Sequence, residues 1–260
     1  MTTPEPDPST SAPEGDDLQQ GLFSHLLELR SRLLKSIATV VLVLLALVPF
    51  ANRLYTQLAA PLVARLPEGA HLIATGVTSP FITPLKLALY ASLFISMPVI
   101  LYQLWAFVSP GLYKHEKRLA RPLLFAAMAL FYLGCAFAYF LVLPAAFRFL
   151  IAVTPRGVEM MTDITHYLDF VMLMFFAFGL CFEVPVAVVV LAAVGVVDLD
   201  KLRSARRYAI VGAFAIAALI TPPDITSMMM LGIPMCLLYE LGIMAVRWLV
   251  KPGSLRTDVR

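Results

Sequence analysis

The chain has 260 residues, of which 60% are apolar and only 14% charged, with a formal net charge of +3 and a mean hydropathy of +0.84. A soluble domain carries about 25% charged residues, so this composition excludes a soluble enzyme, a nucleic-acid-binding protein and a disordered protein. It indicates an integral membrane protein.

The chain begins with a polar segment, residues 1–21, that holds five acidic residues, four prolines and no Lys or Arg. Such a stretch buries too little apolar surface to order itself, so we predict a disordered acidic tail. Without it the remaining chain has a formal net charge of +8.

Residues 22–35 have the pattern of an amphipathic helix in front of the first span. Glu28 and Arg32 share its polar face and are spaced to form an i,i+4 ion pair. Arg30 projects instead from the centre of the apolar face. Taken alone, the position of Arg30 is as consistent with a side chain that extends to the lipid phosphates as with a functional role.

Six stretches contain no charged residue or only one, and a membrane-crossing helix needs about 20 such residues. We therefore predict an all-α integral membrane protein with a six-helix domain over residues 22–250, followed by a cytoplasmic tail at 251–260. The fifth span is short for a bilayer. Prolines within the spans predict kinked helices at Pro49, Pro98, Pro144, Pro185 and Pro234. The predicted spans are 34–53, 84–109, 120–147, 167–196, 207–221 and 225–247.

The distribution of basic residues predicts the orientation. Fifteen of the twenty Lys and Arg residues fall in segments 30–35, 114–121, 201–207 and 247–260, which lie on one side if the spans alternate. The positive-inside rule then places both termini in the cytoplasm, and that basic face should favour anionic lipid headgroups. On the other side, the first outer loop, residues 53–83, is predicted to be irregular.

Two acidic residues interrupt the spans. Glu183 lies near the middle of the fourth, where a carboxylate is costly and is often functional. It either faces a cavity and binds a polar ligand or exchanges a proton, or it is protonated or bonded to a backbone carbonyl freed by Pro185 and only supports packing. Glu240 lies nearer the inner end of its helix, where we expect a structural contact with Arg247 or lipid headgroups.

Glu116 is the carboxylate of a strongly basic inner loop, residues 109–118. It either balances its neighbours at the surface or joins Glu28 in binding a cationic ligand. Two separated carboxylates suit two guanidinium groups, because each pair can be planar and bidentate. The four histidines lack metal spacing, and no nucleotide-binding or hydrolase motif occurs, so we expect no metal, cofactor or nucleic acid.

Several segments, in this order, resemble TatC, the multi-span subunit of the twin-arginine protein translocase. The resemblance covers residues 22–250. The segments that carry it are 25–32 (HLLELRSR), 79–81 (SPF), 98–118 (PVILYQLWAFVSPGLYKHEKR), 134–140, 182–185 (FEVP), 221–224 (TPPD) and 233–235 (IPM).

This resemblance implies a kinked, cup-shaped receptor in the bacterial plasma membrane that is not an enzyme. It implies binding of the twin-arginine signal peptides of folded cargo at the cytoplasmic face and export driven by the proton-motive force. The implied partners are single-span TatA-type and TatB-type proteins, membrane lipids and further copies of the chain.

The resemblance also assigns roles to individual residues. Glu28 and Glu116 would hold the paired arginines of the signal, with Arg30 and Phe107 shaping the adjoining surface, and Glu183 would line the concave face. Pro61, Phe81 and Asp224 match functional positions on the outer side. Thr221 and Met228 match a partner-helix contact, although the family commonly has Gln where this chain has Met228.

Two other classes remain open on the residues alone. A proton-coupled secondary transporter would also use Glu183, but it usually shows internal repeats, which are absent here. A membrane-embedded hydrolase would need a nucleophile and a base, or paired acids, within the spans. That class is the least supported of the three.

Overall fold

The computed structural model describes residues 14–63, 72–108, 120–155, 161–220 and 225–249. Within these segments the chain consists of helices joined by short turns and irregular stretches, with one isolated bridge between Ile73 and Asp163. The elements are α1 (Glu14–Leu47), the 3-10 turn η1 (Val48–Phe50), α2 (Ala51–Val63), α3 (Ser79–Val108), α4 (Ala120–Phe137), the π-helical turn η4 (Ala138–Val142), α5 (Leu143–Val153), α6 (Ile164–Phe182), α7 (Val184–Ala193), α8 (Leu199–Ser204), α9 (Arg206–Ile220) and α10 (Ile225–Leu249).

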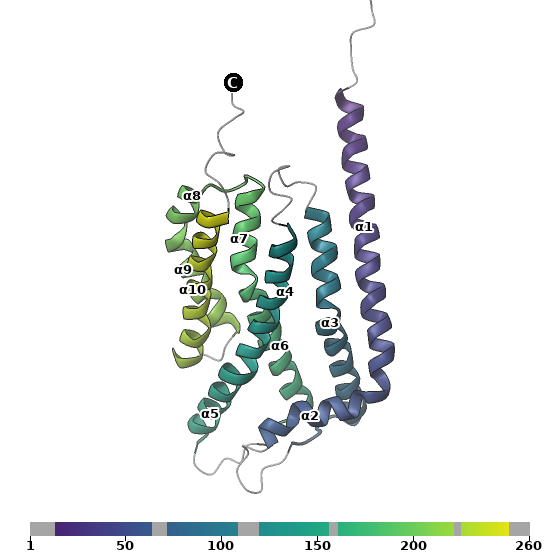
Figure 1. Cartoon of the computed structure of the whole chain (residues 1–260). Helices are drawn as coiled ribbons and strands as arrows, with labels where there is room; N and C mark the ends of the chain where they lie inside the picture. Colours follow the sequence, from purple (N-terminus) through teal and green to yellow (C-terminus); the bar gives the residue numbers. More distant parts are fainter. Residues whose placement is uncertain (1–13, 64–71, 109–119, 156–160, 221–224, 250–260) are drawn as a thin grey trace, which may run out of the picture.

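The helices form an up-and-down bundle (Figure 1). α1 packs along α3, α4 packs on α6, and α10 packs on both α7 and α9. α1 begins and α10 ends at the upper end of the bundle in Figure 1, whereas α2 lies across the lower end. The predicted all-α membrane fold is confirmed.

Five helical segments among the described residues are long and apolar enough to cross a membrane: Leu27–Ala60, Ser79–Phe107, Arg121–Val153, Ile164–Ala193 and Met228–Leu249. The remaining predicted span corresponds to α9, whose 15 residues extend about 22 Å at 1.5 Å per residue. The predicted shortness of that helix is therefore seen in the structure. α9 and α10 also stop short of the lower end of α5 in Figure 1.

The prolines act differently from one another. The first span turns into α2 at η1, which contains Pro49, and Pro144 begins α5 after the π-helical turn. Pro185 lies at the start of α7, directly after the break at Glu183. Pro98 and Pro234, by contrast, lie inside continuous helices. Three of the five predicted interruptions thus coincide with helix boundaries.

Two segments differ from the sequence prediction. α1 already begins at Glu14, although a disordered tail was predicted through residue 21. The prediction of an irregular loop from residue 53 is wrong as far as Val63, because α2 is an amphipathic helix there. Its Leu54 and Leu58 pack against the bundle core.

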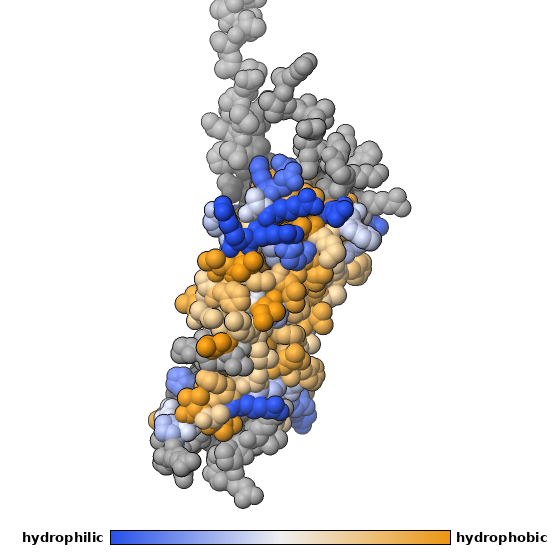
Figure 2. Space-filling model, turned by 90° about the vertical axis from the view of Figure 1, so that its left-hand side faces the viewer, coloured by the Kyte–Doolittle hydropathy of each residue, from blue (hydrophilic) through white to orange (hydrophobic). Residues whose placement is uncertain are grey.

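Apolar side chains form both the core and much of the surface. Phe131, Leu168, Met174 and Phe178 are fully buried, whereas Leu42, Leu45 and other large apolar residues are largely exposed. On the face formed by α8, α9 and α10, an apolar belt lies between hydrophilic bands (Figure 2). This arrangement fits a bundle surrounded by lipid.

Candidate functional site

Glu28 lies on α1 and is half-buried. Its Oε1 atom accepts hydrogen bonds from Arg32 Nε at 3.0 Å and Arg32 Nη2 at 2.5 Å, which confirms the predicted i,i+4 pair. Among the described residues, Glu28 Oε2 receives no hydrogen bond. One edge of the carboxylate therefore remains able to accept a second guanidinium group.

The neighbouring candidates Arg30 and Phe107 lie on two different helices. Arg30 is exposed on α1, and Phe107 is half-buried near the end of α3. Because α1 and α3 pack side by side in opposite directions, Glu28, Arg30 and Phe107 all lie towards the upper end of the bundle (Figure 1). Glu116 lies outside the described residues.

Glu183 occupies the break between α6 and α7. It lines an open cavity of about 420 Å³ formed by α3 on one side and α6 and α7 on the other. The other lining residues, including Met97, Leu104 and Trp105, are apolar. Glu183 Oε1 is buried and finds no hydrogen-bond partner among the described residues.

This geometry argues against one part of the second interpretation, in which Glu183 is bonded to a backbone carbonyl freed by Pro185. A carboxylate that only capped a freed backbone group would have its buried oxygen bonded, since unpaired buried polar atoms are costly. The break itself has a local cause, because Pro185 has no backbone N–H to continue the helix. The cavity can accept an apolar helix or segment, with one polar group available to it.

Of the other predicted residues, the structure describes the side chains of Phe81 and Met228, which lie on different helices. Phe81 is 73% exposed in the first turn of α3, near the lower end. Met228 packs against the core in the first turn of α10. Pro61 lies in α2, but its side chain is outside the described part, and Thr221 and Asp224 lie outside it altogether.

A polar clamp at the lower end was not predicted. The Asp163 carboxylate accepts hydrogen bonds from Thr75 Oγ1 at 2.6 Å and Thr75 N at 2.9 Å, and from Thr165 N and His166 N at the start of α6. The bond from the Thr75 hydroxyl, followed by the amide bonds, lowers the pKa of Asp163. One local signal was available in the sequence, because Asp is a common residue at the N-cap of a helix. No local signal indicates the long-range contact between Asp163 and Thr75.

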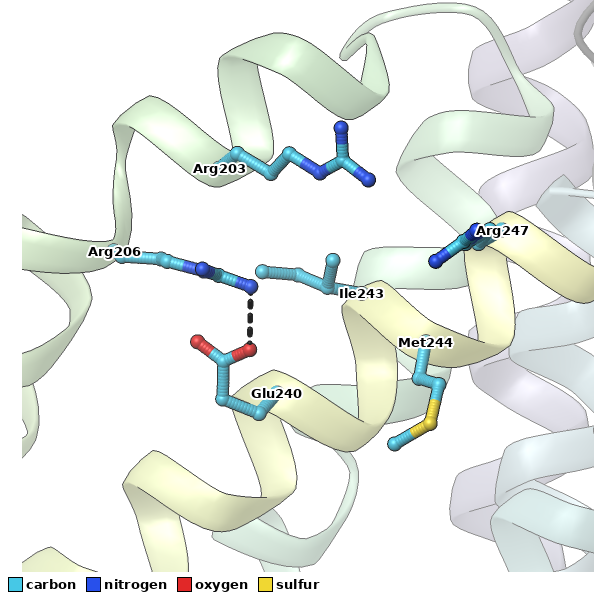
Figure 3. A pocket seen from close by; sticks show the side chains of 6 residues that line it. All are labelled: Arg203, Arg206, Glu240, Ile243, Met244 and Arg247. Carbon is cyan, nitrogen blue, oxygen red and sulfur yellow. Dashed lines mark hydrogen bonds and ion pairs between the residues drawn. The ribbon is translucent and has the colours of Figure 1, made fainter.

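Two ion pairs between helices were also missed. Lys86 of α3 contacts Asp169 of α6, with Nζ 2.6 Å from Oδ1. Glu240 pairs with Arg206 of α9 at 2.7 Å (Figure 3), so the expected contact with Arg247 is wrong. The turn after α8 places the start of α9 beside α10, which brings Arg206 within reach of Glu240.

Comparison with known proteins extends this description. The family model for Sec-independent protein translocase protein (TatC) matches residues 24–234. A Sec-independent protein translocase protein TatC from Azotobacter chroococcum mcd 1 is 55% identical over 234 residues, covering 90% of this chain and 91% of the relative. The protein of the same name from Escherichia coli K12 is 52% identical over 239 residues, covering 92% and 93%.

A solved structure matches the fold as well. The crystal structure of a twin-arginine translocase receptor, TatC, superposes with a TM-score of 0.75 at 39% sequence identity. The match covers 87% of this chain and all of that one. The helical arrangement described above is therefore shared along nearly the whole chain.

Proposed function

Because the chain belongs to the TatC family of Sec-independent protein translocase proteins, we propose that it binds twin-arginine signal peptides of folded cargo and initiates their export. The observation that carries the proposal is its likeness to a crystallised twin-arginine translocase receptor along most of its length. The work of transport is binding and assembly, driven by the proton-motive force, and requires no catalytic residue.

The signal arginines bind at the upper end of the bundle. Glu28 supports this role because its Oε2 edge is open while Arg32 holds Oε1. Arg32 thereby orients the carboxylate without using its full capacity, since a carboxylate accepts about four hydrogen bonds. Glu116 supplies the second carboxylate, and Arg30 and Phe107 border the bound peptide.

The apolar segment of the signal peptide inserts into the cavity between α3 and α7. The lining is apolar except for Glu183, and burial of apolar surface favours insertion of a helix there. Glu183 Oε1 then gains a partner from a polar group of the peptide.

Single-span partners of the TatA and TatB type pack on α9 and α10. Leu219, near the end of α9, and Ile225, at the start of α10, are 86% and 74% exposed. Met228 lies one turn further along α10. Met228 is half-buried against the core, and its remaining surface contacts a partner helix where the family commonly has an amide. Further copies of the chain complete the assembly.

The basic upper end faces the cytoplasm, so both termini are cytoplasmic. Support comes from the exposed basic residues at that end, among them Lys201, Arg203, Arg207 and Arg247, and from the positive-inside rule. We infer that the membrane is the bacterial plasma membrane, since the relatives described above are bacterial.

Site-specific photocrosslinking tests the receptor proposal. A signal peptide with a photoreactive group beside its Arg-Arg pair should crosslink to the wild-type chain in membranes, and much less to Glu28→Ala or Glu116→Ala. We expect a loss of about tenfold or more for either, because a charge-assisted hydrogen bond contributes about 1.5–3 kcal/mol.

Asp200→Ala is the matched control. Asp200 is an acid at the same end of the bundle, and its side chain is 95% exposed with only a 3.8 Å contact to Arg203. Crosslinking that stays unchanged in both glutamate variants, or falls equally in Asp200→Ala, would refute the assignment of the arginine site.

A further inference from the structure

A basic pocket lies at the upper end of the bundle between α8, α9 and α10, on different helices from the Glu183 cavity. It encloses about 200 Å³. Figure 3 shows the guanidinium groups of three arginines around the side chain of Ile243, with one carboxylate beneath them. The lining residues are Arg203, Arg206, Glu240, Ile243, Met244 and Arg247.

The positive charge of this pocket is only partly neutralised. Glu240 pairs with Arg206 at 2.7 Å. Arg203 has a 3.8 Å contact with Asp200, whose nearly fully exposed carboxylate gives little stabilisation. Within the described part of the chain, Arg247 has no ion-pair partner. Three guanidinium groups thus share one lining carboxylate, and an anion would relieve their mutual repulsion.

The walls of the pocket are held in place from behind. The Tyr239 hydroxyl of α10 donates a hydrogen bond to the Leu202 carbonyl of α8 at 2.9 Å. Leu202, Ile243 and Val246 are buried in the same apolar cluster. Because this packing fixes α8 against α10, binding of a ligand would cost little conformational entropy in the helices that carry the arginines.

The pocket opens where the protein surface changes from polar to apolar. On the face formed by α8, α9 and α10, a hydrophilic band directly adjoins the apolar belt (Figure 2). Leu237, Leu241, Met244 and Trp248 follow one face of α10 at spacings of three and four residues and are 51–84% exposed. Met244 also lines the pocket, so this apolar stripe leads from the pocket into the belt.

We propose that the pocket binds the phosphate of an anionic membrane lipid. Arg203, Arg206 and Arg247 contact the phosphate oxygens, since guanidinium groups match phosphate geometry. The acyl chains lie along the stripe from Leu237 to Trp248. A free phosphate ion would contact the same arginines but would leave the apolar stripe uncovered. We therefore assign the pocket to a lipid. The inference does not depend on signal-peptide binding.

Trp248 is a built-in reporter for the test. The chain has two tryptophans, so Trp105→Phe leaves Trp248 alone in the last turn of α10. The full chain in this background is reconstituted into vesicles of phosphatidylcholine and phosphatidylglycerol. In one set of vesicles the phosphatidylglycerol is brominated, and in the other set the phosphatidylcholine is brominated. Quenching of Trp248 measures the preference of its nearest lipid. We expect clear preference for phosphatidylglycerol.

Two charge-matched double variants separate the pocket from the surface. Both double variants lose the general attraction of two basic groups to an anionic lipid surface, about 1 kcal/mol or about fivefold for each group. Arg203→Gln with Arg247→Gln also loses direct contacts with the lipid phosphate, so it should lower the preference at least fivefold more than Lys201→Gln with Arg207→Gln. Lys201 and Arg207 are exposed at the same end but do not line the pocket. Glu240→Gln should raise the preference, a gain that a misfolded protein cannot produce.

Three results would overturn the proposal. They are equal quenching by both lipids in the unmutated pocket, equal losses in the two double variants, and a preference that Glu240→Gln fails to raise. Inorganic phosphate distinguishes the two sources of the anion. If millimolar phosphate abolishes the preference while chloride at equal ionic strength does not, the pocket is a soluble-anion site and the lipid assignment fails.

Discussion

Substitution of Gly134 by alanine should weaken the contact between α4 and α6. Gly134 is buried, and a Cβ atom placed there would lie 2.5 Å from the backbone oxygen of Phe178 and 3.0 Å from Cβ of Phe182. The nearest obstacle is backbone, which cannot rotate away, so the two helices have to separate. Close approach at small residues is a common way for membrane helices to associate.

The cost can be bounded from these distances. Overpacking of this kind costs about 1–3 kcal/mol, and the higher helix propensity of alanine returns about 0.5–1 kcal/mol. Separation of α4 and α6 also disturbs the ring contacts of Phe137 with Phe178 and Phe182, at 5.6 and 5.7 Å between centroids. We expect a net loss of about 1–2 kcal/mol, which lowers Tm by about 2–8 °C at 2–4 °C per kcal/mol.

Thermal unfolding of the detergent-solubilised full chain measures this effect, with Gly212→Ala as the control. A Cβ at Gly212 in α9 meets no heavy atom within 4 Å, so this substitution should leave Tm unchanged or raise it slightly. If Gly134→Ala unfolds at the wild-type temperature, or both variants shift alike, the tight contact does not limit the packing of α4 on α6.

Two further substitutions test the clamp and the cavity. Since its hydrogen bonds lower the pKa of Asp163, the clamp stabilises the fold above the unfolded-state pKa of about 3.9 and loses that contribution as pH falls towards the folded-state value. Asp163→Asn should therefore be less stable than wild type at pH 7 and show a smaller loss of Tm on acidification to pH 3; an identical acid profile would contradict this role. Glu183→Gln should keep crosslinking of the signal arginines near Glu28 but reduce crosslinking of the apolar segment at Ile100 in the cavity. Normal export by Glu183→Gln across pH would instead make this acid structural.

Much of the bundle follows from local sequence pattern. Long apolar stretches have one stable outcome in lipid, a helix that satisfies its own backbone hydrogen bonds. This is why the helical class, the short α9 and the break at Pro185 could be predicted. The Glu28–Arg32 pair was predictable for the same reason, because an i,i+4 spacing on a helix is a local property.

The extent of α1 and α2 was harder to predict. The polar composition of residues 14–21 favoured disorder, yet α1 continues through them. Most of α2 was predicted to be part of an irregular loop because residues 53–83 are rich in Pro, Thr and Ser, but its Leu54 and Leu58 pack against the bundle core. In the first case the helix continues from its neighbouring residues, and in the second it is stabilised by tertiary contacts. Local composition reveals neither effect.

The contacts between helices depended on the tertiary structure. Asp163 meets Thr75 across 88 residues and Lys86 meets Asp169 across 83, distances at which sequence spacing carries no information. Glu240 was expected to contact Arg247 of its own helix or lipid headgroups, because only local partners could be considered, whereas α9 supplies Arg206.

The composition that marks this chain as a membrane protein, and the basic segments that orient it, are sums over residues and need no knowledge of neighbours. The cavity around Glu183 and the three arginines around Ile243 are relations between helices. They arise only when packing sets the distance and direction of one side chain from another, because hydrogen bonds and ion pairs act over a few ångströms.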